Sequence, residues 1–188
     1  MFSGLCARAQ PGELLRVRGP NGAGKTSLLR MICGLSAPAE GTISWSGKNI
    51  RGLGEEFSRQ LIYIGHTPAS KADLSVGENL RISLTLGGMP AGDPVVAAAL
   101  EAAGLSALRD APARFLSQGQ RRRLALSRLA VDPAPALWVL DEPFNALDAL
   151  AAQWLGSRII RHVGNGGITV LTCHHDTALG GVPQQVLD

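Results

Sequence analysis

The eight residues GPNGAGKT at positions 19–26 constrain the fold of this chain more than any other feature. They follow a short segment of alternating apolar residues, Glu13–Arg18, and precede a segment with helical spacing of leucine and isoleucine, Ser27–Cys33, which stops at Gly34. Glycines let the backbone wrap closely, so that successive N–H groups point at phosphate oxygens, and the start of the following helix adds a favourable dipole. A strand, a glycine-rich turn and a helix in this order predict a phosphate-binding loop in an α/β domain.

The residue types in this loop indicate a nucleoside triphosphate with Mg²⁺. We expect the Lys25 ammonium to lie on the β- and γ-phosphates and the Thr26 hydroxyl to ligate Mg²⁺. The other residues expected to surround the nucleotide here are Gly19, Pro20, Asn21, Gly22, Ala23, Gly24 and Ser27. The alternative, a glycine-rich turn with only a structural role, is disfavoured by the strand before it and the helix after it.

A second motif places two carboxylates after an apolar run. Leu137–Leu140 has the continuous hydrophobicity of a strand buried on both faces, and Asp141, Glu142 and Pro143 follow it directly. Open α/β sheets bind ligands at the carboxyl ends of their strands. We expect Asp141 to hold Mg²⁺, through water, and Glu142 to polarise the attacking water. An Asp-Glu-Pro sequence alone would often be a surface turn, but the phosphate loop favours the catalytic interpretation.

The remaining pattern predicts further strands and a block of helices. Strands are expected at Thr42–Trp45, Leu61–Ile64 and Ile168–Thr172. Helices are expected from Ser75 (opened by a Ser75-x-x-Glu78 capping box), over Pro94–Ala103 with Asp93 as N-cap, from Ser117 to about Val131, and over 148–163. The alternation predicts a mainly parallel sheet flanked by helices. The 188 residues are expected to form one domain, with a core from 1–66 and 132–188 and a helical subdomain from 67–131.

The net charge and the cysteine content exclude few classes of partner or function. The net charge of +3 permits phosphate, nucleic-acid or anionic membrane partners and selects none of them. The only basic cluster, Arg121–Arg123, is expected to be a solvated helix face, with contact to a nucleotide or an acidic neighbour as the alternative. Cys6, Cys33 and Cys173 cannot all pair and are expected to be reduced thiols. No apolar run of membrane-spanning length occurs, so any role at a membrane requires a partner there.

Three further motifs complete a family pattern. Leu116–Gln120 (LSQGQ), Asn145–Asp148 (NALD) and Thr172–His174 (TCH) resemble the signature sequence, the D-loop and the switch histidine of ABC transporter ATPases, in the family's order. This resemblance implies a P-loop NTPase fold of the ABC type, which hydrolyses ATP as a head-to-tail pair of chains. One chain would supply the phosphate loop, Asp141, Glu142 and a catalytic His174. The opposite chain would supply the signature residues, and the site residues implied outside the loop are Ser117, Gly119, Gln120 and Asp148.

Sequences around the motifs resemble one branch of that family. YIGHTP at 63–68, SVGENL at 75–80 and GGITVLTCH at 166–174 are similar to the haem-exporter ATPases of cytochrome c maturation. This resemblance implies haem export, integral membrane transporter subunits as partners, a location on the cytoplasmic side of the bacterial inner membrane, and no nucleic-acid partner. The alternatives are the ATPase of another small-molecule ABC transporter and a degenerate ATP-binding regulatory subunit. An ABC ATPase acting on ribosomes or DNA would normally have two such domains or a long insertion.

The chain departs from the family pattern in two places. The family usually has one more strand before this start, with an aromatic residue that stacks on adenine, and Phe2 lies too close to Lys25 to be that residue. The first N-terminal strand is therefore expected to be missing. The family's glutamine loop falls at His66-Thr67, where there is no glutamine. The shorter threonine is expected to change coupling or rate. His66 is expected to be a polar cap at a strand end, with a catalytic base as the alternative.

Overall fold

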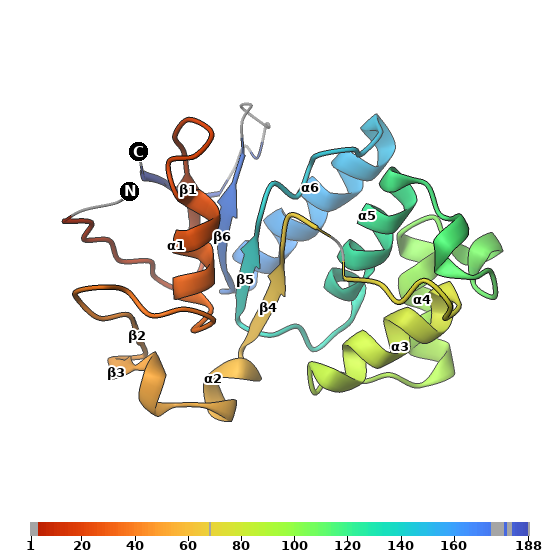
Figure 1. The fold of residues 1–188 in the computed structure, drawn as a ribbon, viewed down its shortest axis with the longest axis horizontal. Helices are drawn as coiled ribbons and strands as arrows, with labels where there is room; N and C mark the ends of the chain where they lie inside the picture. Colours follow the sequence, from red (N-terminus) through yellow and green to blue (C-terminus); the bar gives the residue numbers. More distant parts are fainter. Residues whose placement is uncertain (1–3, 68, 174–178, 180–181, 188) are drawn as a thin grey trace. The chain divides into compact units, whose positions relative to one another are not determined.

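The structure, a computed structural model, describes residues 4–67, 69–173, 179 and 182–187 of the chain. It divides into two compact units (Figure 1). The first, here called the sheet unit, consists of Met1–His66, Pro135–Glu142 and Ile160–Asp188. The second, the helical unit, consists of Thr67–Ala134 and Pro143–Ile159. The domain boundaries expected from the sequence stay a prediction.

The sheet unit is built on a parallel sheet with the strand order β4-β5-β6-β1-β7 within the described residues. The strands are β1 (Leu14–Val17), β4 (Leu61–Ile64), β5 (Leu137–Leu140), β6 (Ile168–Thr172) and β7 (Gln184–Leu187). All four neighbouring pairs run parallel, with Leu140 opposite Leu171 where β5 and β6 end. The predicted parallel sheet is confirmed. Strand β7 was not predicted, because its sequence QQVL has no apolar alternation and its side chains are mostly exposed.

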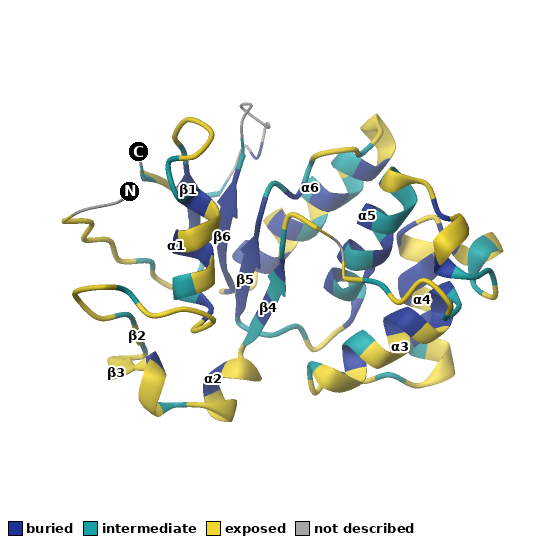
Figure 2. Ribbon diagram, viewed as in Figure 1, coloured by how far each residue is buried: buried dark blue, intermediate teal, exposed yellow. Residues whose placement is uncertain are grey.

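The core of the sheet unit lies against both faces of the central strands. Helix α1 (Lys25–Ile32) contacts β5 and β6, and its Leu28 and Leu29 join Val139 and Val170 in one hydrophobic cluster. On the other strand face, the Trp138 ring stacks on His162 of α6 (Ala149–Gly164), with ring centroids 3.9 Å apart. All residues of β1, β5 and β6 are buried (Figure 2), and for β5 the continuous hydrophobicity of Leu137–Leu140 predicts this.

The strand expected at Thr42–Trp45 is confirmed only at Ser44–Trp45, where it forms one side of a short hairpin. Strands β2 (Ser44–Trp45) and β3 (Lys48–Asn49) pair with each other as a separate antiparallel sheet. The two residues that connect them, Ser46 and Gly47, have φ values of 50° and 78°. Two positive φ angles are typical of the tight turn that joins antiparallel strands. The segment continues through η1 (Ile50–Gly52) and α2 (Glu55–Ser58) to β4.

The helical unit begins with α3 (Val76–Leu86) and α4 (Asp93–Ala102). After the short turns η2 (Ser106–Leu108) and η3 (Ala113–Phe115), the chain forms α5 (Gln118–Leu126) and η4 (Ser127–Ala130). Helices α3 and α5 both begin with the capping box that their sequences predict. Helix α6 contributes its residues up to Ile159 to this unit. Among the described residues, no helix combines the length and the hydrophobicity needed to cross a membrane.

Two predicted helix boundaries are wrong. Asp93 is the first residue of α4 and Gly92 is its N-cap, because the Asp93 carboxylate instead pairs with the guanidinium groups of Arg81 and Arg109. Helix α5 ends at Leu126 instead of continuing to about Val131. There the Ser127 hydroxyl donates to the Leu124 carbonyl at 2.7 Å, a local side-chain bond that competes with regular α-helical bonding.

Candidate functional site

The loop between β1 and α1 has the backbone conformation that its glycines predict. Gly19, Gly22 and Gly24 have φ values of 138°, 83° and 94°, which side chains with a Cβ rarely adopt. Gly24 is the N-cap of α1, and no side chain caps the first turn of that helix. The N–H groups at the start of α1 therefore have no side-chain acceptor at the N-cap, and such groups favour an anion.

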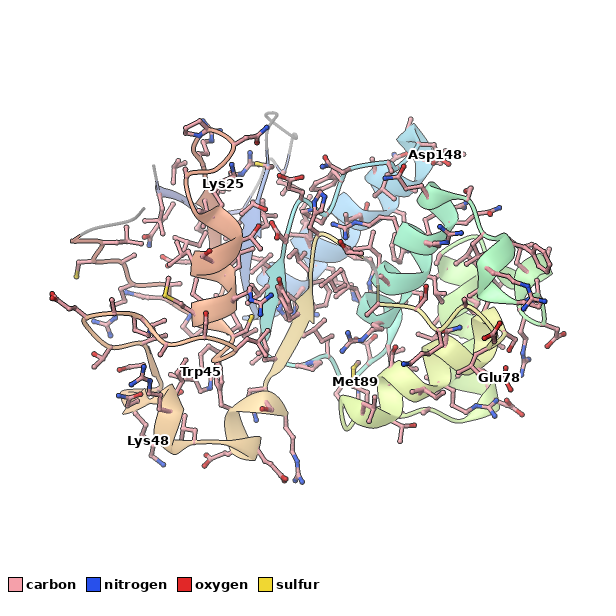
Figure 3. The ribbon with its side chains drawn as sticks, viewed as in Figure 1. Lys25, Trp45, Lys48, Glu78, Met89 and Asp148 are labelled. Atoms are coloured by element: carbon pink, nitrogen blue, oxygen red, sulfur yellow. The ribbon has the colours of Figure 1, made fainter. Side chains whose placement is uncertain are left out.

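Lys25, the first residue of α1, turns its ammonium back onto this loop. Its Nζ donates to the carbonyl oxygens of Gly19 at 2.7 Å and Pro20 at 3.0 Å, and the residue is only 7% exposed. Figure 3 shows Lys25 at the end of α1 that meets the loop. The structure thus places a buried positive charge inside the glycine-rich turn, where a phosphate group would find both the charge and the backbone donors.

Asp141 lies at the carboxyl end of β5 and accepts hydrogen bonds on both of its oxygens. The Thr26 hydroxyl donates to Oδ2 at 2.7 Å, and the Thr172 hydroxyl donates to Oδ1 at 2.7 Å. Asp141 is 1% exposed, so these donors stabilise a buried carboxylate. Residues from α1, β5 and β6 meet at this point, as expected for the carboxyl edge of a parallel sheet.

Thr26 and Asp141 fit a magnesium ion. A hydroxyl and a carboxylate are oxygen donors of the kind that Mg²⁺ prefers, and the 2.7 Å hydrogen bond brings them to one place. Mg²⁺ usually takes only one or two protein carboxylates and completes its shell with water and phosphate oxygens. The described residues contain no cluster of three or more His, Cys, Asp or Glu side chains that could hold a metal.

Glu142 follows Asp141 with an unusual backbone conformation. Its φ of 47° lies in the left-handed region, and its N–H donates to the Thr172 hydroxyl oxygen at 2.7 Å. Non-glycine residues in this region are uncommon, and they cluster at functional sites. The Glu142 carboxylate is mostly buried, and its Oε2 lies 3.3 Å from His66 Nδ1. Two contacts therefore orient Glu142: the bond of its N–H to Thr172 and the approach of its carboxylate to His66.

Sequence reasoning missed two residues of this arrangement. The sequence assigns Thr172 no role beyond its place in the TCH motif and favours a polar cap over a catalytic base for His66, yet both residues contact Glu142. The pairing of β5 with β6 could have identified Thr172, since both strands end at the same edge of the sheet. No pattern in the sequence indicated the contact between His66 and Glu142. The expected switch histidine, His174, lies outside the described residues.

The signature residues belong to the helical unit and form the start of α5. Ser117 is the N-cap: its hydroxyl accepts from the Gln120 N–H at 3.2 Å, while its own N–H donates to Gln120 Oε1 at 2.8 Å. A Cβ added at Gly119 would lie 2.8 Å from the carbonyl oxygen of Ala146. Asp148 Oδ1 accepts from the Ala151 N–H at 2.8 Å and so caps the start of α6.

The expectation of a solvated arginine face on α5 is wrong for two of its residues. Arg122 is 3% exposed, and its Nε donates to the carbonyl oxygen of Pro143 at 3.3 Å. Arg123 Nη1 donates to the carbonyl oxygens of Ala103 and Gly104, at 3.4 Å each. A guanidinium group carries five N–H donors, so it can satisfy carbonyl groups at a helix end such as that of α4.

Comparison with known proteins agrees with the five motifs. The family model described as ABC transporter matches residues 2–145. The chain is 47% identical to the cytochrome c biogenesis ATP-binding export protein CcmA of Methylococcus capsulatus, over 93% of this chain and 84% of that protein. It is also 47% identical to the CcmA of Aromatoleum aromaticum, over 100% of this chain and 87% of that protein.

A solved structure supports the same assignment. An ABC transporter ATP-binding protein from Pyrococcus furiosus superposes with a TM-score of 0.78 at 26% identity, covering 95% of this chain and 86% of that one. The resemblance inferred from the motifs is therefore confirmed. With its phosphate loop, its strand-end carboxylates and these relatives, the chain belongs to the ABC transporter family of ATP-binding proteins, in the branch of the cytochrome c biogenesis export ATPases.

Proposed function

We propose that this chain binds and hydrolyses ATP to power the export or delivery of haem for cytochrome c maturation. The observation that carries the ATPase reaction is the hydrogen-bonded series from Thr26 through Asp141 and Thr172 to Glu142. The sheet unit also holds the buried Lys25 ammonium on the glycine-rich loop. The names of the relatives support the link to cytochrome c biogenesis.

Each group has a role that its chemistry supports. The loop of residues 19–27 would hold the β- and γ-phosphates through its N–H groups, while Lys25 exchanges its carbonyl partners for phosphate oxygens. Thr26, and Asp141 through water, would hold Mg²⁺, which neutralises charge on the phosphates when bound. The Glu142 carboxylate would accept a proton from the attacking water. His174 is proposed as a second catalytic residue from the family motif alone.

The signature residues are proposed to act on the nucleotide of a second copy of the chain. Helix α5 begins at Gln118, so the Gly119 N–H lies in its first turn, where backbone N–H groups without an intrahelical acceptor favour an anion. The γ-phosphate bound by one chain would then be contacted by the signature residues of the other chain, which are Ser117, Gly119 and Gln120. Asp148 of that second chain would lie beside them. The further partners would be the integral membrane subunits of the transporter, at the cytoplasmic side of the inner membrane. No nucleic-acid partner is expected.

The Glu142→Gln variant tests the hydrolysis step. The amide keeps the shape of the side chain but loses its basicity, so kcat should fall about 10²- to 10⁴-fold while ATP still binds. Glu56→Gln is the matched control, because Glu56 is exposed on α2 of the same unit, and it should hydrolyse ATP at the wild-type rate. Wild-type turnover by Glu142→Gln would remove Glu142 from the catalytic role.

Mixing two inactive variants tests the head-to-tail pair. Ser117→Arg blocks the signature surface but leaves its own phosphate loop intact, whereas Lys25→Ala does the reverse. A mixed dimer would therefore contain one complete site, and ATPase activity should return when the two proteins are combined with the membrane subunits. If differently tagged copies of the two variants co-purify as mixed dimers and no activity returns, two independently working sites that each combine residues of both chains are excluded.

A further inference from the structure

We infer that Thr172 is a positioning residue for the ATPase reaction, and that its single hydroxyl sets the orientation of Asp141 and Glu142 relative to each other. This inference rests on the proposed function, since it takes Asp141 as the magnesium-side carboxylate and Glu142 as the residue that activates water. Thr172 is the last residue of β6, next to the end of β5. It belongs to neither the phosphate loop nor the pair of carboxylates.

The hydroxyl of Thr172 uses both of its hydrogen-bonding functions. It donates to Asp141 Oδ1 at 2.7 Å and accepts from the Glu142 N–H at 2.7 Å. Thr172 is completely buried and Asp141 nearly so. Because a hydroxyl has only one proton, the donor bond to the carboxylate directs a lone pair of the oxygen toward the N–H. The two bonds therefore define one geometry for the Asp141–Glu142 peptide.

This geometry determines where both carboxylates lie. Asp141 is held on Oδ1 by Thr172 and on Oδ2 by Thr26, so the carboxyl group has little freedom to rotate. Glu142 has a φ of 47°, a conformation that needs support from its surroundings. Its N–H bond to the Thr172 hydroxyl supplies that support. Without the hydroxyl, the backbone at Glu142 could relax and carry its carboxylate away from the attacking water.

A second buried threonine on the same strand provides a control. Thr169 is also completely buried on β6, but its hydroxyl makes no hydrogen bond within the part of the chain that the structure describes. A buried threonine in this strand therefore does not need a hydrogen bond from its hydroxyl. Replacing either threonine by valine keeps the shape and removes one hydroxyl. Only at Thr172 does this remove bonds to the two carboxylate residues.

The kinetic experiment compares Thr172→Val, Thr172→Ser and Thr169→Val in the full-length chain with MgATP. Thr172→Val should lower kcat about 10- to 100-fold, as is typical when a residue that orients a metal-side ligand is lost, with KM for ATP changed by less than about threefold. Thr172→Ser keeps the hydroxyl and should recover most of the activity. Thr169→Val should be as active as the wild type. If Thr172→Val does not fold, Thr172→Ala takes its place in the comparison.

A second measurement needs neither nucleotide nor metal. Hydrogen exchange of the Glu142 amide, followed by NMR, should be at least about tenfold faster in Thr172→Val than in the wild type, and close to wild type in Thr172→Ser. The Glu142 amide in Thr169→Val should exchange as in the wild type. This result reports the hydrogen bond itself and does not depend on ATP hydrolysis.

Three outcomes would overturn the inference. One is an unchanged kcat in Thr172→Val, and another is equal losses in the valine and serine variants, which would mean that side-chain size matters and the hydroxyl does not. The third is unchanged Glu142 amide exchange in Thr172→Val. Failure of the proposed function looks different: the wild type would not hydrolyse ATP, or Glu142→Gln would not slow it, whatever the amide exchange shows.

Discussion

Replacing Gly119 by alanine should damage the start of α5, although alanine is the better helix former. The ideal position of the new Cβ lies 2.8 Å from the carbonyl oxygen of Ala146, whereas ordinary contacts begin at 3.4 Å. The two groups must therefore separate by 3.4 − 2.8, or about 0.6 Å. The obstacle is a backbone atom, so no side-chain rotation can relieve it.

Neither side of this contact can move without loss. The start of α5 is held by the reciprocal bonds of Ser117 and Gln120, and Ala146 has a φ of 61°, in the left-handed region. Overpacking of this kind destabilises by about 1–3 kcal/mol, against a gain in helix propensity of at most about 1 kcal/mol. Subtracting the full propensity gain leaves a net loss of up to about 2 kcal/mol in the free energy of unfolding. Since a misplacement of about 1 Å can lower a rate 100-fold, kcat should fall about tenfold or more.

Urea unfolding and steady-state ATP hydrolysis measure these two effects. Gly164→Ala is the matched control, because Gly164 is a helical glycine of α6 with nothing within 4 Å of its added Cβ. It should leave activity unchanged and alter stability by no more than about 1 kcal/mol, in the stabilising direction. If Gly119→Ala is as stable and as active as the Gly164→Ala protein, the close approach of Gly119 to Ala146 does not constrain this segment.

Three further predictions concern the sheet unit. Lys25→Ala should weaken ATP binding about 100-fold in calorimetry, because it removes the ammonium held on the loop, and unchanged affinity would contradict the loop's role. Gly167→Ala should lower the free energy of unfolding by about 1–3 kcal/mol, because the added Cβ would lie 2.6 Å from Cδ2 of the buried His162 ring. A smaller loss in a His162→Ala background would confirm this cause. Burial raises the pKa of Cys33 to about 12, so at pH 8 iodoacetamide should label the exposed Cys6 far faster than Cys33, and equal labelling in the folded chain would refute this.

Local features of this protein were predictable because they depend on neighbouring residues. The glycines of the loop require φ angles that few other residues adopt, and the capping boxes at Ser75 and Ser117 join residues three positions apart. The apolar run Leu137–Leu140 is typical of a strand buried on both faces, and it forms one. The order of the five motifs along the chain was sufficient to predict the family.

The boundaries of single elements depended on competition that the sequence does not display. Asp93 is a good N-cap by residue type, but two guanidinium groups from other segments bind its carboxylate more favourably. Arg122 and Arg123 lie in a polar stretch of sequence that suggests exposure. In the structure their guanidinium groups instead donate hydrogen bonds to backbone carbonyl oxygens of other segments. Among the described strands, β7 lies at the edge of the sheet and pairs with β1 alone, and its mostly exposed side chains give its sequence no apolar pattern.

In the candidate site, too, some features follow from the sequence and others only from the tertiary structure. Residue types alone predicted that Lys25, Thr26, Asp141 and Glu142 would carry the chemistry, because phosphate and Mg²⁺ require a cation, a hydroxyl and carboxylates. Only the tertiary structure places the Thr172 hydroxyl between the two carboxylate residues, 30 positions along the chain from Glu142. A threonine in a buried strand has the same local pattern whether its hydroxyl is used or not, as Thr169 shows. The register of β6 against β5 decides which threonine hydroxyl lies next to Asp141. That register depends on how the whole sheet packs, so the sequence of β6 alone does not reveal it.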